Sequence, residues 1–542
     1  GLLSIHATEE ALDAARERGN ASDPLIAEIA GRLVGQLQRA GRTANASQRL
    51  SSIEASFPGI QLTEGGVPVD MRALRAQLAS RLEALNRRPV IGARLGTPTV
   101  LTGWRLVMPA GLPAAPPLTD HVMMESQDGE MAMWQIGDGG LTRRWGGVRT
   151  DETLLRLDES GAWFVRPLNP NQAEQNFTVL RRDVQTGTIT FATLGFEEAL
   201  AHDVVAPIDF QRRVQRFSTP LRPDVSPTQI MFDSDEDTIV LVERVGRVAA
   251  YDLTTGALLW SRARTMDRVH DATLAAGTLL IGGADVSLDG ELPLNSNSDG
   301  MTHLLLAIDV RTGDTLFRQE ESRPVRWVAI SPENRGLLGS EDGVAAFDLF
   351  RGTELWRLET GEVSRSKAAW PVAGRVLVLN EGDWLWQINT VEGTLGEDSF
   401  DTRDRLDGVI PWIVTYPLGD NVAIASLHGL MVFDPEGSLV GVSLPGPRNT
   451  IQPPAFARDH IVTIERDGTR LEDAPLNGFT LNVYAGPSCR IVSSTVLELG
   501  LNPDAVDVVD NAIIVSAGWA TAVIPTSDGP VNATPSPREP GL

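Results

Sequence analysis

Two kinds of hydrophobic pattern divide the chain. In roughly the first 90 residues, apolar side chains recur every three or four positions, which is the spacing of one face of an α-helix. One stripe is formed by Leu25, Ile26, Ile29, Leu33, Val34 and Leu37, and a second by Met71, Leu74, Leu78, Leu82 and Leu85. From about residue 95, short β-rich runs alternate with turns rich in Gly, Asp and Asn. The pattern predicts an N-terminal helical region followed by an all-β region.

The helical region has clear start and stop signals. Asp23, followed by a Pro, favours a helix start because Asp caps the first turn and Pro fits the first helical position. Gly41 ends that helix. The stretch 37–58 loosely resembles a tetratricopeptide helical hairpin, and a generic helical hairpin is the broader description. Short amphipathic helices bury little surface alone, so the two stripes are expected to cover each other, to dock on the β region or to meet another protein.

One short unit recurs through the β region. Its clearest copies read AYDLTTGALLW from Ala250 to Trp260, AIDVRTGDTLF from Ala307 to Phe317, AFDLFRGTELW from Ala346 to Trp356 and, more loosely, RRDVQTGTITF from Arg181 to Phe191. Degenerate copies surround Gly139, Gly393, Gly437 and Gly486. A β-sandwich would not repeat one hairpin signature in this way, so the repetition favours a propeller.

The chemistry of the unit is that of a β-hairpin. In the clearest copy, the Asp252 side chain can bond to backbone N–H groups further along and start a turn. Gly256 supplies the positive φ that a tight turn often requires. Trp260 ends the returning strand with a large apolar side chain suited to packing between neighbouring sheets.

The turn glycines lie mostly about 40–50 residues apart, which is the length of a four-stranded propeller blade. Eight such turns predict about eight blades, with seven left open because the first repeats are degenerate. The segment 505–524 reads as further strands without a turn unit. We expect it to pair with the first β-strands, near residues 98–135, because closing a propeller with both chain ends removes a free sheet edge.

The repeated string A-x-D-x-x-T-G-x-x-x-W resembles the tryptophan-docking repeat of pyrroloquinoline-quinone-type (PQQ-like) propellers, which are similar to WD40 propellers in architecture. The residues that carry the resemblance are Asp252, Gly256, Trp260, Asp309, Gly313, Phe317, Asp348, Gly352 and Trp356. The resemblance covers about residues 95–525 and is strongest from about 226 to 360. It implies an all-β propeller of four-stranded blades behind the N-terminal α-helical region.

The resemblance also implies two classes of relative. Quinoprotein dehydrogenases hold a quinone and calcium at the propeller axis and commonly use adjacent cysteines or a haem domain. The chain has one cysteine, Cys489, and so lacks both features. The other class is non-enzymatic and includes the lipoprotein propeller of the bacterial outer-membrane barrel-assembly machinery. The sequence therefore favours a propeller without catalytic residues or cofactor, with quinone-dependent oxidation as the alternative.

Other candidate sites are less specific. Asn295, Asn297 and Asp299 match the first half of a calcium loop, but position twelve is Leu306 where a bidentate Glu is needed, so an ordinary polar loop is the alternative. The acidic run 233–237 is typical of a solvated turn. The chain's His residues show no helical ligand spacing; they are His6, His121, His202, His270, His303, His428 and His460. His270-Asp271 could serve acid–base chemistry but has no nucleophile beside it.

Trp384 and Trp386 share one face of a predicted strand because side chains alternate along a strand. Packing in the core and a platform for a stacked ligand are both open for this pair. A buried structural role is expected for Cys489, because the sequence places no base beside it.

Charge and composition narrow the partners. A formal net charge of −24 argues against nucleic-acid binding, which needs a basic surface. The sequence contains no run of about 18 apolar residues, the length that would predict a membrane-spanning helix. We expect a helical region over 1–92, a propeller over 93–525 closed by C-terminal strands, and a disordered Pro-rich tail over 526–542.

The resemblance implies a protein-binding scaffold in the periplasm or cell envelope, with partners bound through the N-terminal helices or the propeller loops. The alternative is a regulatory propeller within a larger signalling protein.

Overall fold

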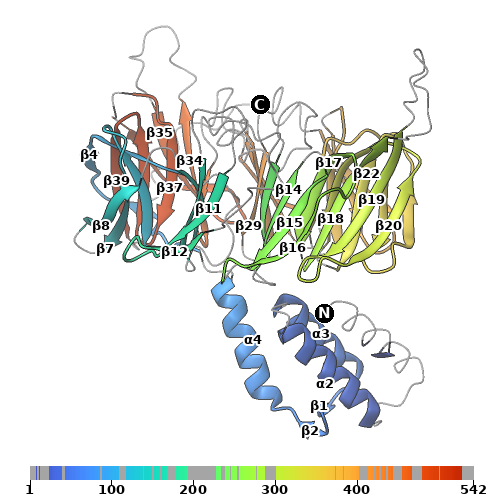
Figure 1. The fold of residues 1–542 in the computed structure, drawn as a ribbon. Helices are drawn as coiled ribbons and strands as arrows, with labels where there is room; N and C mark the ends of the chain where they lie inside the picture. The colour runs from blue at the N-terminus through green and yellow to red at the C-terminus, as the bar shows by residue number, and fades with distance from the viewer. Residues whose placement is uncertain are drawn as a thin grey trace.

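The structure is a computed structural model. It covers Thr8, Ala11, Leu12 and residues 24–39, 43–85, 88–108, 118–137, 140–148, 152–158, 161–167, 177–192, 228–233, 238–243, 246–252, 255–275, 277–286, 301–331, 333–372, 374–382, 384–401, 413–418, 421–426, 429–434, 438–443, 454–466, 479–497, 499 and 501–527. Within these residues the chain forms a small helical region and a large β-propeller (Figure 1). None of the helices in these ranges has the length and apolarity needed to cross a membrane.

The helical region contains α2 (Pro24–Arg39), α3 (Thr43–Ser56) and α4 (Met71–Leu85). A short hairpin, β1 (Thr63–Glu64) with β2 (Val67–Pro68), connects α3 to α4. Asp70 caps α4, since its carboxylate accepts hydrogen bonds from the N–H groups of Arg72 and Ala73, both at 3.0 Å. Glu28 of α2 accepts bonds from the N–H groups of Gly65 and Gly66 and so holds the hairpin to the helix.

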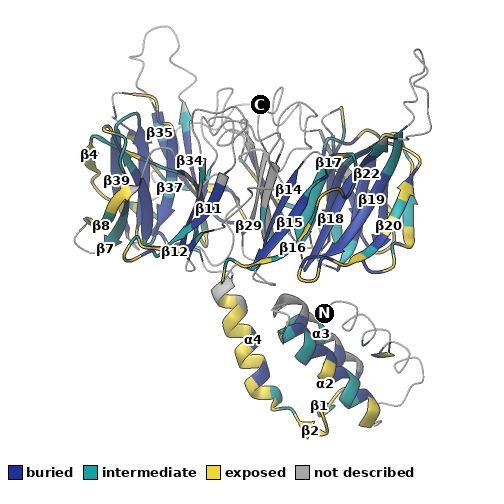
Figure 2. Cartoon of the chain, in the orientation of Figure 1, coloured by how far each residue is buried: buried dark blue, intermediate teal, exposed yellow. Residues whose placement is uncertain are grey.

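The predicted apolar stripes are buried in part. Leu33 and Leu37 of α2 and Leu74 and Leu78 of α4 are buried, whereas Leu25 is 55% exposed. Leu25 lies in the first turn of α2, where a helical side chain leans back toward the N-terminus and beyond its packing partners. Most of the remaining surface of α4 is exposed (Figure 2).

In the part of the chain that the structure describes, eight four-stranded antiparallel sheets follow the helices, and each uses four consecutive strands. The strands of the first four sheets are β5 (Trp104–Leu106), β6 (His121–Ser126), β7 (Met131–Gly137), β8 (Gly140–Val148); β9 (Thr153–Asp158), β10 (Gly161–Pro167), β11 (Phe177–Arg182), β12 (Ile189–Ala192); β13 (Thr228–Asp233), β14 (Thr238–Glu243), β15 (Val248–Asp252), β16 (Leu258–Arg262); and β17 (Arg268–Ala275), β18 (Thr278–Val286), β19 (Met301–Asp309), β20 (Thr315–Glu321).

The strands of the other four sheets are β21 (Val325–Ile330), β22 (Arg335–Ser340), β23 (Val344–Asp348), β24 (Glu354–Leu358); β25 (Ala368–Val372), β26 (Arg375–Leu379), β27 (Trp384–Asn389), β28 (Leu395–Asp401); β29 (Ile413–Leu418), β30 (Asn421–Ser426), β31 (Gly429–Phe433), β32 (Leu439–Ser443); and β33 (Ala455–Phe456), β34 (His460–Arg466), β35 (Phe479–Ala485), β36 (Arg490–Leu497). The all-β propeller class is as expected. These eight sheets carry the eight turn units counted in the sequence, but the described ring contains one sheet more than the expected eight.

Both ends of the β region build one further sheet, here called the closing sheet. It contains β37 (Ala505–Val509), β38 (Ala512–Ala517) and β39 (Ala520–Ser527), and β39 pairs with β3 (Arg94–Leu95) and β4 (Thr99–Thr102). The expected pairing of this C-terminal segment with residues near 98–135 is confirmed for β4, whereas β3 lies just before that range. Within the described residues the ring therefore has nine sheets, because the closing sheet adds to the eight that carry turn units.

The sheets form one closed ring. The first strands of neighbouring sheets contact each other, as β13, β17, β21 and β25 do, so they line the axis and the last strands form the rim. Shared apolar clusters link sheets β5–β8 to β9–β12, β13–β16 to β17–β20, and β33–β36 to the closing sheet. Another cluster joins the closing sheet back to β5–β8.

One apolar cluster also joins the helical region to the ring. Its members on the helical side include Leu33, Leu37, Ile53, Phe57, Leu74 and Leu78, and those on sheets β17–β20 and β21–β24 include Leu280, Phe317, Val328 and Phe350. The helices lie at one end of the ring (Figure 1). The apolar stripes were expected to pack on each other, on the propeller or on another protein. Packing on each other and on the propeller explains why these side chains are buried.

Candidate functional site

The repeated turn is held by its Asp. In the clearest copy, Asp252 Oδ1 accepts hydrogen bonds from the backbone N–H of Thr255 at 2.7 Å and from its hydroxyl at 2.9 Å. Gly256 closes the turn at φ +77°, and its N–H donates to the carbonyl of Asp252. In this turn the N–H groups two and three residues after the Asp need acceptors, and the Asp carboxylate supplies one.

Other repeats use the same bonds. The residues that accept backbone N–H groups at the Asp position are Asp183, Asp309, Asp348 and Asn389. In the looser copy, bonds from Thr186 hold the pKa of the Asp183 carboxyl below its usual value. The local sequence thus fixes a turn of one shape around much of the ring.

Five of the turn glycines receive an aromatic side chain from the preceding sheet. Trp260 of β16 lies on Gly313, where an added Cβ would come within 2.7 Å of the indole, and its Nε1–H donates to the carbonyl of Val310 at 2.7 Å. Trp356 lies on Gly393 and donates to the carbonyl of Thr390 at 2.9 Å. Glycine is required at these positions for two reasons: its φ is positive, and a side chain would displace the indole.

The same contact recurs with a different aromatic ring. Phe317 lies on Gly352, and Phe191 lies on Gly256. Trp145 lies on Gly187 and donates to the carbonyl of Val184. We call these five contacts the aromatic docks. They join consecutive sheets from β5–β8 to β25–β28, so the residues of the repeat motif have a structural position between sheets.

His270 and Asp271 also join sheets. Both lie on β17, and both bond to the backbone of β21 in the next sheet. The imidazole Nδ1 of His270 lies 3.0 Å from the carbonyl oxygen of Val325 and can donate to it, and Asp271 Oδ2 accepts from the N–H of Val328 at 2.8 Å. Desolvation raises the pKa of Asp271 to about 7. The pair suggested by the sequence for acid–base chemistry thus makes inter-strand hydrogen bonds.

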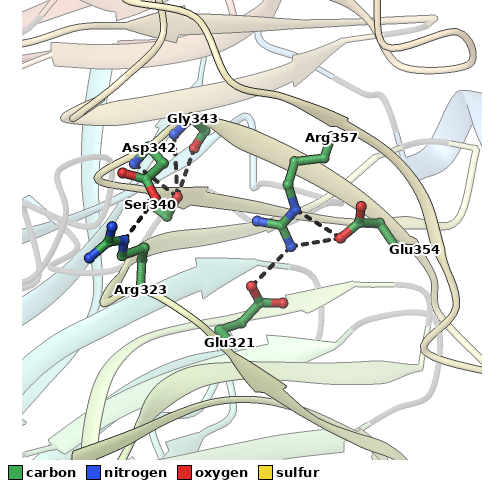
Figure 3. A network of polar contacts seen from close by, with 7 residues as sticks. All are labelled: Glu321, Arg323, Ser340, Asp342, Gly343, Glu354 and Arg357. Atoms are coloured by element: carbon green, nitrogen blue, oxygen red, sulfur yellow. Dashed lines mark hydrogen bonds and ion pairs between the residues drawn. The ribbon is translucent and has the colours of Figure 1, made fainter.

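An ion-pair network crosses the same region of the ring. Arg357 of β24 bonds to Glu354 on its own strand at 2.7 Å and to Glu321 of β20 at 3.0 Å (Figure 3). Burial raises the pKa of the Glu321 carboxyl. Arg323 pairs with Asp342 at 2.8 Å nearby. Sequence patterns do not reveal this network, because Glu321 and Arg357 are 36 positions apart and both lie outside the repeat motif.

Charged side chains are also buried in sheet β9–β12. Glu152 is fully buried and pairs with Arg166 and with Arg182. Arg156 and Asp158 form a second buried pair. Buried ion pairs of this kind fix side-chain geometry more than they add stability. These ion pairs fix how the side chains pack inside the sheet. Their Arg, Glu and Asp side chains do not form a nucleophile or metal-binding arrangement.

The remaining sequence candidates separate into described and undescribed positions. The possible calcium residues Asn295, Asn297 and Asp299 lie outside the described residues, as do positions 234–237 of the acidic run. His6, His202 and His428 lie outside them too. Within the described ranges, His, Cys, Asp and Glu side chains form no group of three that could hold a metal ion.

Three further candidates have structural surroundings. The imidazole of His121 is buried, and its Nδ1 atom lies 2.6 Å from Oδ1 of Asp120. Trp386 packs in the apolar cluster between sheets β21–β24 and β25–β28, with the ring of Trp384 6.5 Å away. Cys489 is buried, and desolvation raises the pKa of its thiol to about 11, which disfavours the reactive thiolate.

The rim of the ring is the part of the surface on which exposed apolar side chains gather. Large apolar residues at the outer strands include Val100, Ile189, Leu258, Leu355, Val440, Val442, Ile491 and Val496. Most outer strands also carry charges, as β20, β24 and β28 do. The outer strand β36 has one charged residue, Arg490, at its first position.

Over residues 213–334 the chain matches a family model described as outer membrane protein assembly factor BamB. The fold is a β-propeller with PQQ-like repeats. This model spans the two strongest repeat units, around Trp260 and Phe317, and the propeller fits a protein-interaction scaffold in general terms.

Solved structures similar to this propeller include three of low identity. The computationally designed Ika8 protein is 16% identical, with a TM-score of 0.41, over 68% of this chain and 94% of that one. BamB from Moraxella catarrhalis is 14% identical, with a TM-score of 0.37, over 79% and 100%. The C-terminal WD40 domain of Sif2 is 13% identical, with a TM-score of 0.40, over 69% and 94%. No curated protein matches the sequence.

Proposed function

We propose that this propeller is a non-catalytic scaffold that binds protein partners within a cell-envelope assembly. The observation that carries the proposal is the use of the repeat residues: Asp252, Trp260, Gly313 and their equivalents hold turns and join sheets. Because the repeat residues hold the turns and the sheets together, the ring is rigid, and its loops and edges are available to partners. The matched family model, named for an outer membrane assembly factor, supports the envelope setting.

The surroundings of His270, Asp271 and Cys489 also support a non-catalytic function. His270 and Asp271 bond to backbone groups of β21, and Cys489 is buried with a raised thiol pKa. A general base and its nucleophile need to lie within hydrogen-bond reach of each other. These residues offer no such pair.

Affinity purification tests the scaffold proposal directly. The full chain, tagged and expressed in its native host, is expected to retain one or a few defined proteins in stoichiometric amounts after crosslinking and washing. A charge-matched unrelated protein serves as control. Retention of the same background proteins by both baits contradicts the scaffold function.

Two further measurements address the alternatives. Incubation with pyrroloquinoline quinone and calcium is expected to give no dye reduction with alcohols or sugars, and steady turnover would favour the oxidoreductase. Cell fractionation is expected to place the native protein in the envelope fraction. Recovery with a cytoplasmic signalling protein would favour the regulatory alternative.

A further inference from the structure

The outer strand β36 has the longest uncharged run among the described strands at the rim. It reads RIVSSTVL, and after Arg490 it carries no charge over seven residues. By contrast, β20 contains Arg318, Glu320 and Glu321, and β24 contains Glu354 and Arg357. Charges on edge strands normally prevent pairing with other chains. The outer strands β12 and β32 also carry no charge, but they are only four and five residues long. β36 therefore offers the longest uncharged edge of the described rim.

The hydrogen-bonding edge of β36 is open. Within the described residues β36 pairs with β35 alone, so its second row of N–H and C=O groups faces away from the sheet. At about 3.3 Å per residue, eight residues give an edge of about 26 Å, long enough for a strand of six to eight residues. A row of backbone donors and acceptors is satisfied best by another extended backbone.

A bulge gives this edge a defined side-chain pattern. Ile491 pairs with Tyr484 of β35 and Val496 pairs with Thr480, with a register shift between them. Paired residues of antiparallel strands share one face of a sheet, so the bulge at Val492 brings Ile491 to the same face as Ser494 and Val496. Ile491 is 50% exposed and Val496 63% exposed.

The opposite face of β36 is already occupied. Leu497 is buried in the apolar cluster shared with the closing sheet, and Val492 packs against that cluster. The free face therefore presents an apolar, a polar and a second apolar side chain in order, with the exposed Arg490 at one end. A strand added beside β36 would place its own alternate side chains against this series.

We propose that the edge of β36 binds an extended segment of a partner protein by adding it as a fifth strand to sheet β33–β36. The segment has β-branched apolar residues on either side of a small polar residue, in alternate positions, and an acidic residue opposite Arg490. This identifies a binding surface for the scaffold function and rests on that function. A peptide strand of this chemistry meets no carboxylate on β36.

The probe is a fluorescein-labelled heptapeptide, Asp-Val-Thr-Ser-Thr-Val-Thr, added to the full chain and followed by fluorescence anisotropy. Saturable binding is expected. Ile491→Lys with Val496→Lys should weaken it at least about tenfold by adding charge to the apolar positions. The matched control Leu355→Lys changes a residue 45% exposed on the charged edge β24 and should leave binding unchanged. A peptide with Pro at the central position should not bind, because Pro removes a backbone donor.

Hydrogen exchange supplies a readout that needs no variant. The peptide should slow amide exchange in 490–497 of the wild-type chain and leave 354–358 unchanged. Absence of saturable binding, equal binding by the Pro peptide, or equal loss in Leu355→Lys would overturn the proposal. Self-association of the chain that Val496→Lys abolishes would also overturn it, since the edge would then serve a second copy.

The outcomes separate this proposal from the scaffold function. If wild-type protein and the double Lys variant retain the same native partner, the scaffold function stands and the β36 proposal fails. If neither retains a partner but the peptide binds as expected, the β36 edge is a strand-binding site and the envelope scaffold proposal fails.

Discussion

The two parts of the ring use different chemistry between their sheets. From β5–β8 to β25–β28, an aromatic side chain of each sheet lies on a turn glycine of the next, as Trp260 does on Gly313. At the junction of β29–β32 with β33–β36, Gly441 instead approaches the backbone of Pro487, and β32 and β36 contain no aromatic residue. The docked part thus joins its sheets through ring-on-glycine contacts. The junction of β29–β32 with β33–β36 is instead packed by an apolar cluster that includes Leu430, Phe456 and Tyr484.

This difference separates stability from recognition. An aromatic dock occupies the outer strand with a large side chain whose ring is committed to the next sheet. The outer strands β32 and β36 have no aromatic side chain, and β36 carries β-branched residues and no charge after Arg490. The molecule is therefore expected to lose stability when the docked part is changed and to lose binding when the undocked part is changed.

The largest effect is expected from Trp260→Ala. Removing the indole leaves a cavity between β13–β16 and β17–β20 and an unpaired carbonyl at Val310, and should cost about 3–4 kcal/mol of unfolding free energy. Ile491→Ala on the undocked strand β36 should cost less than about 0.5 kcal/mol, because the side chain is half exposed. Urea unfolding of both variants measures the contrast, and similar losses would contradict it.

The next effect isolates the glycine of the dock. Gly313→Ala imposes both a positive φ and a clash with Trp260, and should cost about 2–4 kcal/mol. Gly374→Ala is the matched control, since φ is +72° there and an added Cβ meets nothing within 4 Å. It should cost about 1–2 kcal/mol from backbone strain alone. Equal losses in chemical unfolding would mean that ring contact adds nothing.

A smaller effect is expected from Trp260→Phe. Phenylalanine keeps an apolar ring on Gly313, as Phe317 does on Gly352, but cannot donate to the carbonyl of Val310. The loss should be about 1 kcal/mol from the missing hydrogen bond, with some further loss of ring contact. Thermal unfolding against wild type measures it, and a loss as large as that of Trp260→Ala would show that the indole shape is indispensable.

The smallest effect is a pH dependence carried by Asp271. Desolvation raises its folded-state pKa to about 7, above the usual value near 4, so the folded protein binds this proton more tightly than the unfolded chain. The contribution to stability is therefore fully present below about pH 4 and is lost as the pH rises toward 7. Asp271→Asn should flatten this part of the stability profile.

Asp507 provides the internal comparison for that measurement. Desolvation raises its pKa to about 6, and its carboxylate accepts the N–H of Val508 within its own strand. Asp271 instead bonds across to the next sheet. Asp507→Asn should flatten the profile over a narrower interval, ending near pH 6. Unchanged profiles in both variants would contradict the titration of either group.

The turn units were predictable because their cause is local. Asp252, Thr255 and Gly256 lie within five positions of each other, and the bonds that they make depend on that short stretch alone. The same locality allowed eight sheets to be counted from eight turns. The closing sheet carries no turn unit, so its status as a ninth sheet depended on how β39 pairs with β3 and β4.

The sequence by itself determined the helical stripes, the repeated hairpin and the β-propeller class, since each follows from periodicity or from neighbouring residues. Only the tertiary structure decided that Trp260 lies on Gly313, that His270 and Asp271 bond to β21, and that Arg357 reaches Glu321. It also decided which face of β36 is free, because the bulge at Val492 changes the alternation of its side chains. These contacts join residues about 35 to 60 positions apart or depend on strand register, and periodicity along one strand does not specify which sheet becomes its neighbour.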